Sequence, residues 1–192
     1  MEWRDGIEPG TMEVKVAELL VATADQADYL IDGSVREVLK LLRERMGMDV
    51  VFVSEFTGGV RELRAVEQSA GHETVAEGQT DSLETTWCQR VVDGRLPELV
   101  PDGAVLQASG QAPPAACPIG TYLSTPIVLG SGEVYGTLCC FSFGVNPKVT
   151  ELDVKKLRYT ADLTAKKIDR SRRVRAEMSL EPIPDPGFKP AR

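Results

Sequence analysis

The chain has 192 residues, of which 42% are hydrophobic and 27% are charged, as in an ordinary globular protein. This length suits one domain with a full core and some additional helix or tail. The net charge of −7 argues against a general nucleic-acid-binding protein, because phosphate contacts require a basic surface.

The cellular setting follows from what the sequence lacks. No apolar run approaches the length of a bilayer span, and the N-terminus has no basic region followed by an apolar stretch. The four cysteines include no CxxC pair, which argues against a disulfide framework or a zinc cluster. We therefore expect a cytoplasmic protein that contacts neither membrane nor nucleic acid.

Two helices are predicted at the N-terminal end. Residues 1–33 are expected to form a loose arm followed by a helix over 11–31, where apolar residues recur at steps of three and four. Ser34 and Glu37 match a capping box, which predicts the start of a second helix that ends near Gly47. This helix should turn five apolar residues inward, namely Val35, Val38, Leu39, Leu42 and Met46.

A first hairpin and a less regular segment follow. Residues 48–56 and 60–69 read as two strands joined by a Gly-containing turn. Residues 70–80 are predicted to be a loop, and Asp81 or Ser82 to cap a short helix that ends at Gly94. A brief strand is expected over 97–100. The connection over 102–118 is long and rich in Gly, Ala, Ser and Pro, which is typical of functional lids or disordered segments.

The strongest strand signal is a second hairpin over 120–143, where two apolar-rich runs flank Gly130-Ser131-Gly132. We expect it to form the centre of an antiparallel sheet. A last helix should run from Glu151 to about Met178, with Thr150 and Asp153 at its cap. Its apolar stripe has the spacing of a coiled-coil seam and consists of Val154, Leu157, Ala161, Thr164 and Ile168. Residues 179–192 are Pro-rich and are expected to be a tail or linker.

With these elements in this order, the chain over 34–175 resembles the GAF domain family. The matching text includes Gly136-Thr137-Leu138 in the second run of the central hairpin. The segments that carry the resemblance are 87–92 (WCQRVV), 97–102 (PELVPD), 119–127 (IGTYLSTPI) and 132–142 (GEVYGTLCCFS).

The resemblance implies an α+β fold related to PAS domains, placed here at 34–178. A twisted antiparallel sheet of about six strands would carry the terminal helices on one face and the short helix and loops on the other. Family members bind cyclic nucleotides, tetrapyrroles, haem or other small molecules there, and many dimerise through their terminal helices. We therefore expect a small-molecule ligand of unknown identity, a homodimer, and an output domain or partner protein. The sequence names no cofactor.

Four residues are candidates for the ligand site: Trp87, Cys88, Cys117 and Tyr122. Cys88 lies on the short helix that borders the pocket in GAF proteins, but free cysteines are commonly buried for packing, which is the preferred explanation of this residue. Tyr135 is assigned to either the pocket or the core. In bilin-binding GAF domains a His follows the anchoring Cys, whereas Gln89 follows Cys88 here, which argues against bilin attachment. The only histidine, His72, lies in a polar loop, and we expect it to be solvated rather than a haem ligand.

Two alternative functions remain open at this point. Some small GAF proteins are free methionine sulfoxide reductases that use a nucleophilic and a resolving cysteine, and Cys117 and Cys88 would take these roles. The residues that follow Cys117 depart from that subfamily's pattern. The third reading is a ligand-free dimerisation scaffold.

Cys139 and Cys140 are adjacent on a strand and should therefore point to opposite faces of the sheet. The basic run over 166–175 is expected to be a solvated helix face.

Overall fold

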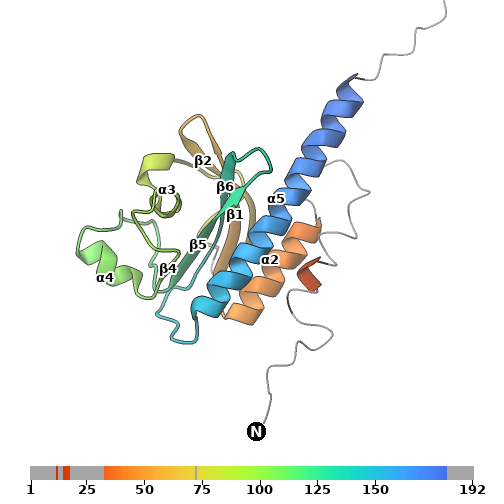
Figure 1. Ribbon diagram of the computed structural model, residues 1–192. Coiled ribbons are helices and arrows are strands. Elements are labelled where there is room, and N and C mark those ends of the chain that lie inside the picture. Colours follow the sequence, from red (N-terminus) through yellow and green to blue (C-terminus); the bar gives the residue numbers. More distant parts are fainter. Residues whose placement is uncertain (1–11, 13–14, 18–32, 72, 181–192) are drawn as a thin grey trace, which may run out of the picture.

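The computed structural model describes residues 12, 15–17, 33–71 and 73–180. It contains a six-stranded antiparallel sheet in the order β3-β2-β1-β6-β5-β4, with helices on both faces (Figure 1). The predicted α+β fold with about six strands is confirmed. Most of the helix expected over 11–31, His72, and residues 181–192 of the expected tail lie outside the described residues.

The strands are β1 (Val50–Thr57), β2 (Val60–Gln68), β3 (Thr80–Ser82), β4 (Leu99–Val100), β5 (Tyr122–Val128) and β6 (Val134–Phe141). The helices are α2 (Gly33–Met46), α3 (Trp87–Val92), α4 (Gly103–Ala108) and α5 (Glu151–Leu180), with a 3-10 turn, η1 (Leu83–Thr85), before α3. Within the described residues, no helix has both the length and the apolar character that a bilayer span requires.

Helices α2 and α5 cover one face of the sheet, and α5 continues past its edge (Figure 1). All five inward-facing residues predicted for α2 are buried. The α5 stripe is also buried, and four of its members belong to the core between the helices and the sheet: Val154, Leu157, Ala161 and Ile168. The seam-like spacing of α5 thus packs this helix on its own sheet. The predicted cap is confirmed, because the Leu152 amide donates to Thr150 Oγ1 and the Thr150 amide to the Asp153 carboxylate (2.9 Å).

The predicted central hairpin is confirmed as β5 and β6, and β6 lies between β5 and β1 at the middle of the sheet. Gly136 is required at the β1–β6 contact, because a Cβ atom there would lie 1.9 Å from the carbonyl oxygen of Ser54. The family-like Gly136 therefore allows the two central strands to approach each other.

Two β-bulges change which face of the sheet the nearby side chains occupy. Between β1 and β2 the register passes from Ala65 to Leu63 and skips Arg64, so Ala65 faces the helices while Leu63 faces away from them. Arg61, two residues before Leu63, lies on the same face as Leu63. Between β5 and β6 the register skips Tyr135, whose ring packs in the helix-side core.

The segment over 69–119 differs from expectation at three points. The predicted loop over 70–80 ends in β3, which pairs with β2. The predicted helix over 82–94 is a 3-10 turn followed by the shorter α3. Its cap is Thr86, whose hydroxyl accepts from the Gln89 amide, whereas Ser82 makes no side-chain cap. The long connection contains α4, whose first amides donate to Asp102. The brief strand is confirmed as β4.

Candidate functional site

The face of the sheet opposite α2 and α5 carries a cavity of about 270 Å³. Its floor is the sheet, and its walls are the β2–β3 edge, the start of α3 and the loop over 113–119. The lining residues are mainly apolar or aromatic and include Phe52, Leu63, Trp87, Ile119, Tyr122 and Phe141, with Arg61, Gln79, Asp81, Thr85 and Thr86 as the polar members. An apolar wall with a few convergent polar groups is typical of small-molecule sites.

Trp87 joins the short helix to the loop that covers the cavity. Its indole Nε1 donates a hydrogen bond to the carbonyl oxygen of Pro113 (2.9 Å). Its ring meets that of Tyr122 edge to face at 5.2 Å between centroids, a favourable aromatic geometry. The helix α4 begins at Gly103, where a Cβ atom would lie 2.9 Å from the Trp87 ring. Trp87 therefore fixes α3, the covering loop and α4 relative to one another.

Arg61 and Asp81 form an ion pair at the cavity wall, and the Arg61 guanidinium also lies 5.7 Å from the centre of the Phe52 ring. The Arg61 side chain is only 14% exposed, and its Nε atom is buried without a hydrogen-bond partner. A buried donor left unpaired is costly, and the charge of this arginine is balanced mainly by Asp81. Sequence reasoning assigned neither residue to the site. Asp81 was expected only as a possible helix cap, and the bulge that turns Arg61 to this face leaves no local sequence signal.

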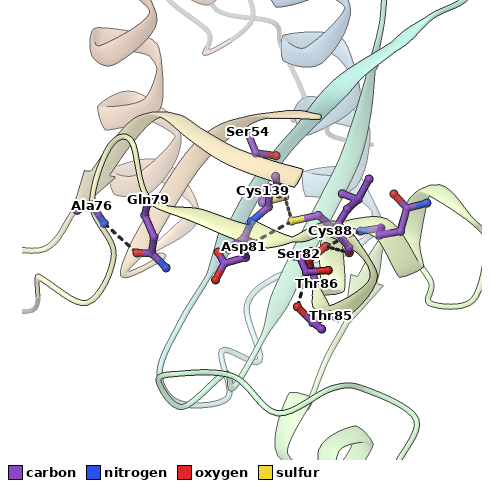
Figure 2. Close-up of polar contacts among 12 residues, drawn as sticks. Ser54, Ala76, Gln79, Asp81, Ser82, Thr85, Thr86, Cys88 and Cys139 are labelled. Atoms are coloured by element: carbon purple, nitrogen blue, oxygen red, sulfur yellow. Dashed lines mark hydrogen bonds and ion pairs between the residues drawn. The ribbon is translucent and has the colours of Figure 1, made fainter. Parts of the chain in front are cut away.

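A polar cluster lies beneath α3, behind the cavity wall. The sulfur atoms of Cys88 and Cys139 are 3.5 Å apart (Figure 2). The Tyr122 hydroxyl donates to Cys88 Sγ (3.4 Å), and Ser124 Oγ and Thr137 Oγ1 lie 3.0 and 3.1 Å from Cys139 Sγ. The sheet register explains the grouping, because Ser124 is the cross-strand partner of Cys139.

The pKa values of the titratable groups in this cluster are shifted in different directions. The hydrogen bond from Cys139 lowers the pKa of the Cys88 thiol, as does the nearby Arg61 guanidinium, although burial opposes both. Burial raises the pKa of Cys139, and the neighbouring Cys88 raises it further. The pKa of Tyr122 is raised by burial and by both cysteines. Of these three groups, Cys88 is therefore the one that loses its proton most readily.

The structure separates the four predicted site residues. Trp87, Cys117 and Tyr122 line the cavity, whereas Cys88 is fully buried behind it. Burial raises the pKa of the Cys117 thiol. The described residues contain no group of three or more histidine, cysteine or acidic side chains placed to hold a metal ion.

The other sequence candidates also have defined positions. Cys139 faces the cavity side and Cys140 the helix-side core, as the strand alternation predicts. Tyr135 lies on the helix side and is not a pocket residue. In the basic run, Arg172 pairs with Glu133 and lies over the Tyr135 ring, so this cation helps to pack α5 against the central hairpin.

Comparisons with solved structures find GAF domains of the same fold. A GAF domain from an Acinetobacter phosphoenolpyruvate-protein phosphotransferase has a TM-score of 0.65 and 16% identity, covering 85% of this chain and 96% of that one. The free methionine-R-sulfoxide reductase of Neisseria meningitidis, solved with its substrate, has a TM-score of 0.65 and 15% identity, covering 85% and 91%. A phycoerythrobilin-bound GAF domain of a cyanobacterial phytochrome has a TM-score of 0.64 and 14% identity, covering 85% and 97%.

At these identities the likeness shows a shared fold alone. A comparison with curated protein sequences found no match. The family model of the GAF domain, however, matches residues 31–169, which is most of the chain. The chain belongs to the GAF domain family.

Proposed function

We propose that this protein is a sensory or regulatory GAF domain that binds a small molecule in the cavity of about 270 Å³ between the sheet, α3 and the loop over 113–119. The observation that carries the proposal is this cavity, with its apolar wall and the Arg61–Asp81 ion pair in its lining. A ligand-free scaffold has no need for such a space, because protein interiors are otherwise closely packed.

The cavity limits the chemistry of the ligand. Its volume lies near the lower end of the roughly 300–1,000 Å³ found for sites of drug-sized ligands, so the ligand should be a small metabolite. Phe52, Trp87 and Tyr122 favour a flat apolar body. Arg61 favours an acceptor or anionic group, and Asp81 favours a donor beside it. A small aromatic or heterocyclic molecule with an acidic or carbonyl group fits both demands.

Binding would signal through the helices on the far face. Tyr122 lines the cavity from β5, and α5 packs mainly on β5. A ligand that favours one arrangement of β5 would shift the population of α5 positions. We propose that the terminal helices form a homodimer that passes this shift to an output domain or partner protein. On α5, Leu152 and Tyr159 are 59% and 40% exposed and seven residues apart, and so offer apolar surface for such a contact.

A thermal-shift screen tests ligand binding directly. A ligand that binds only the folded state raises the melting temperature, so cyclic nucleotides and small aromatic carboxylates are suitable probes. Ile119→Trp should fill the cavity and abolish the shift that a binding probe produces. Val128→Trp is the matched control, because Val128 is 46% exposed and does not line the cavity. The proposal fails if a probe stabilises Ile119→Trp as strongly as the wild type.

The reductase remains a second candidate, because Cys117 lines the cavity and would meet a bound substrate. Two observations weigh against it. Burial raises the pKa of Cys117, which disfavours the nucleophilic thiolate, and the sulfur in contact with Cys88 is that of Cys139. An assay of free methionine sulfoxide reduction decides the matter. Turnover in the wild type that Cys117→Ser abolishes would establish the enzyme.

A further inference from the structure

The strongest unexplained feature outside the cavity is the set of contacts around the sulfur of Cys88. Arg61 Nη1 donates to it at 3.5 Å, the Tyr122 hydroxyl at 3.4 Å, and Cys139 Sγ lies 3.5 Å away. Arg61 has only donors to offer. A neutral Cys88 thiol would also have to place its own proton among these neighbouring donor groups. The geometry suits a thiolate that accepts from Arg61 and Tyr122 and lies in contact with the Cys139 sulfur.

Cys139 is held as the partner of this thiolate. Ser124 and Thr137 bracket its sulfur, and Thr137 in turn lies 2.8 Å from Ser54 Oγ. Cys139 sits on the central strand β6, so the backbone on both sides fixes its position. The two sulfur atoms are in van der Waals contact, and a disulfide would require them to approach to the S–S bond length of about 2.05 Å.

We propose that Cys88 and Cys139 form a redox-active dithiol that a small hydroperoxide converts to a disulfide. Both sulfurs are buried, which restricts the oxidant to a small molecule. The cavity provides its approach, because Arg61 and Tyr122 both line the cavity and contact Cys88 directly. The inference stands apart from the ligand proposal, since it requires no bound metabolite.

The reaction has two steps that balance with hydrogen peroxide as the oxidant. The Cys88 thiolate attacks one peroxide oxygen, the O–O bond breaks, and hydroxide leaves, which gives Cys88 sulfenic acid. Hydroxide then takes the Cys139 proton to form water. The Cys139 thiolate attacks the Cys88 sulfur, the S–S bond forms, and the sulfenic oxygen departs as hydroxide. Overall, one thiolate, one thiol and one peroxide yield a disulfide, one water and one hydroxide.

Oxidation would change the charge beside the cavity. The disulfide removes the negative charge that Arg61 contacts at Cys88 and leaves Asp81 as its anionic partner. The guanidinium would then be less neutralised at the cavity wall. An oxidised protein should therefore bind an anionic probe in the cavity more tightly than the reduced protein does.

The test is a thiol count on the 192-residue chain. After hydrogen peroxide treatment, the protein is unfolded in iodoacetamide and its mass and peptides are measured. We expect four alkylated cysteines in the reduced protein and two in the oxidised protein, with a Cys88–Cys139 peptide cross-link. Arg61→Gln should slow the reaction, because it removes the cation that stabilises the Cys88 thiolate, whereas Arg61→Lys should restore much of the rate.

Matched variants separate this dithiol from the other cysteines. In Cys88→Ser and in Cys139→Ser, the remaining cysteines should form no disulfide after peroxide treatment. Cys140→Ser, one position away but on the opposite face, and Cys117→Ser should still form the cross-link. Trp87 fluorescence on a Trp3→Phe background gives a second readout, because Trp87 adjoins Cys88. Four free thiols after peroxide, or a Cys88–Cys117 link in place of the expected one, would overturn the inference. Either result can be read whether or not the cavity binds a metabolite.

Discussion

The two faces of the sheet are built for different tasks. The helix-side core between the sheet, α2 and α5 is almost wholly aliphatic and closely packed. The opposite layer has a cavity, an ion pair and a cluster of thiols and hydroxyls beneath α3. Cys139 faces the cavity-side layer, and the next residue, Cys140, faces the helix-side core. The comparison indicates that stability comes mainly from the helix side, which leaves the other face free to hold polar groups at some cost.

The largest effect should come from truncating the helix-side core. Leu157 on α5 is fully buried, and Leu157→Ala should lower the free energy of unfolding by about 2–5 kcal/mol through lost burial and a new cavity. Ile119→Ala on the cavity side should cost less, because Ile119 already borders empty space. Urea denaturation of both variants measures the difference. Equal losses would contradict the division between the two layers.

The paired cysteines provide a sharper comparison at the same strand. Cys140→Ser should lower the free energy of unfolding by about 1–3 kcal/mol, because the new hydroxyl would be buried in the aliphatic core. Cys139→Ser should cost less, since Ser124 and Thr137 already surround that position with hydrogen-bonding groups. The same denaturation experiment serves, with equal m-values as the check that both unfold alike. A larger loss for Cys139→Ser would reverse the assignment of the two faces.

The sequence predicted the helix-side layer better than the cavity-side layer. The α2 and α5 core residues and the central hairpin follow from periodicity, because regular elements repeat at 3.6 or 2 residues. The cavity-side elements β3 and α4 are short and lack a full period, so the sequence suggested only loops there. The sequence did not point to Arg61, and it left Tyr135 open between pocket and core, because a bulge reverses the alternation at each position and the bulges at Arg64 and Tyr135 depend on the partner strand. Trp87 and Tyr122 were found through the family resemblance.

The lowered pKa of the Cys88 thiol predicts that stability depends on pH. The pKa of Cys88 is lowered in the folded state by Cys139 and Arg61, so between that pKa and the ordinary thiol value the unfolded chain binds more protons. Stability should therefore rise with pH in this window, by at most about 1.4 kcal/mol per pH unit, and should be lost as the pH falls through the folded pKa. The raised pKa values of Cys139 and Tyr122 act in the opposite sense, but only as the pH passes their ordinary values.

Denaturation at a series of pH values, with absorbance at 240 nm as a thiolate signal, measures this dependence. Cys88→Ser should remove both the slope and the acid loss of absorbance. Cys117→Ser is the control, because the pKa of Cys117 is raised and its removal should leave the slope below the ordinary thiol range unchanged. A slope that persists in Cys88→Ser would place the charge on another group.

The smallest effect should come from the ion pair that links α5 to the β4 edge. Arg158 Nε donates to Glu98 at 2.8 Å, but the Arg158 side chain is 57% exposed. An exposed pair of this kind contributes about 0–1 kcal/mol, so Arg158→Ala should barely change unfolding, and added salt should reduce the difference further. Glu98 keeps its place without the pair, because its carbonyl oxygen accepts from the Ser124 amide (2.9 Å). Arg158→Lys, which keeps the charge, should match the wild type. A loss comparable to that of Leu157→Ala would mean that this exposed contact at the β4 edge stabilises the fold as strongly as the buried helix-side core does.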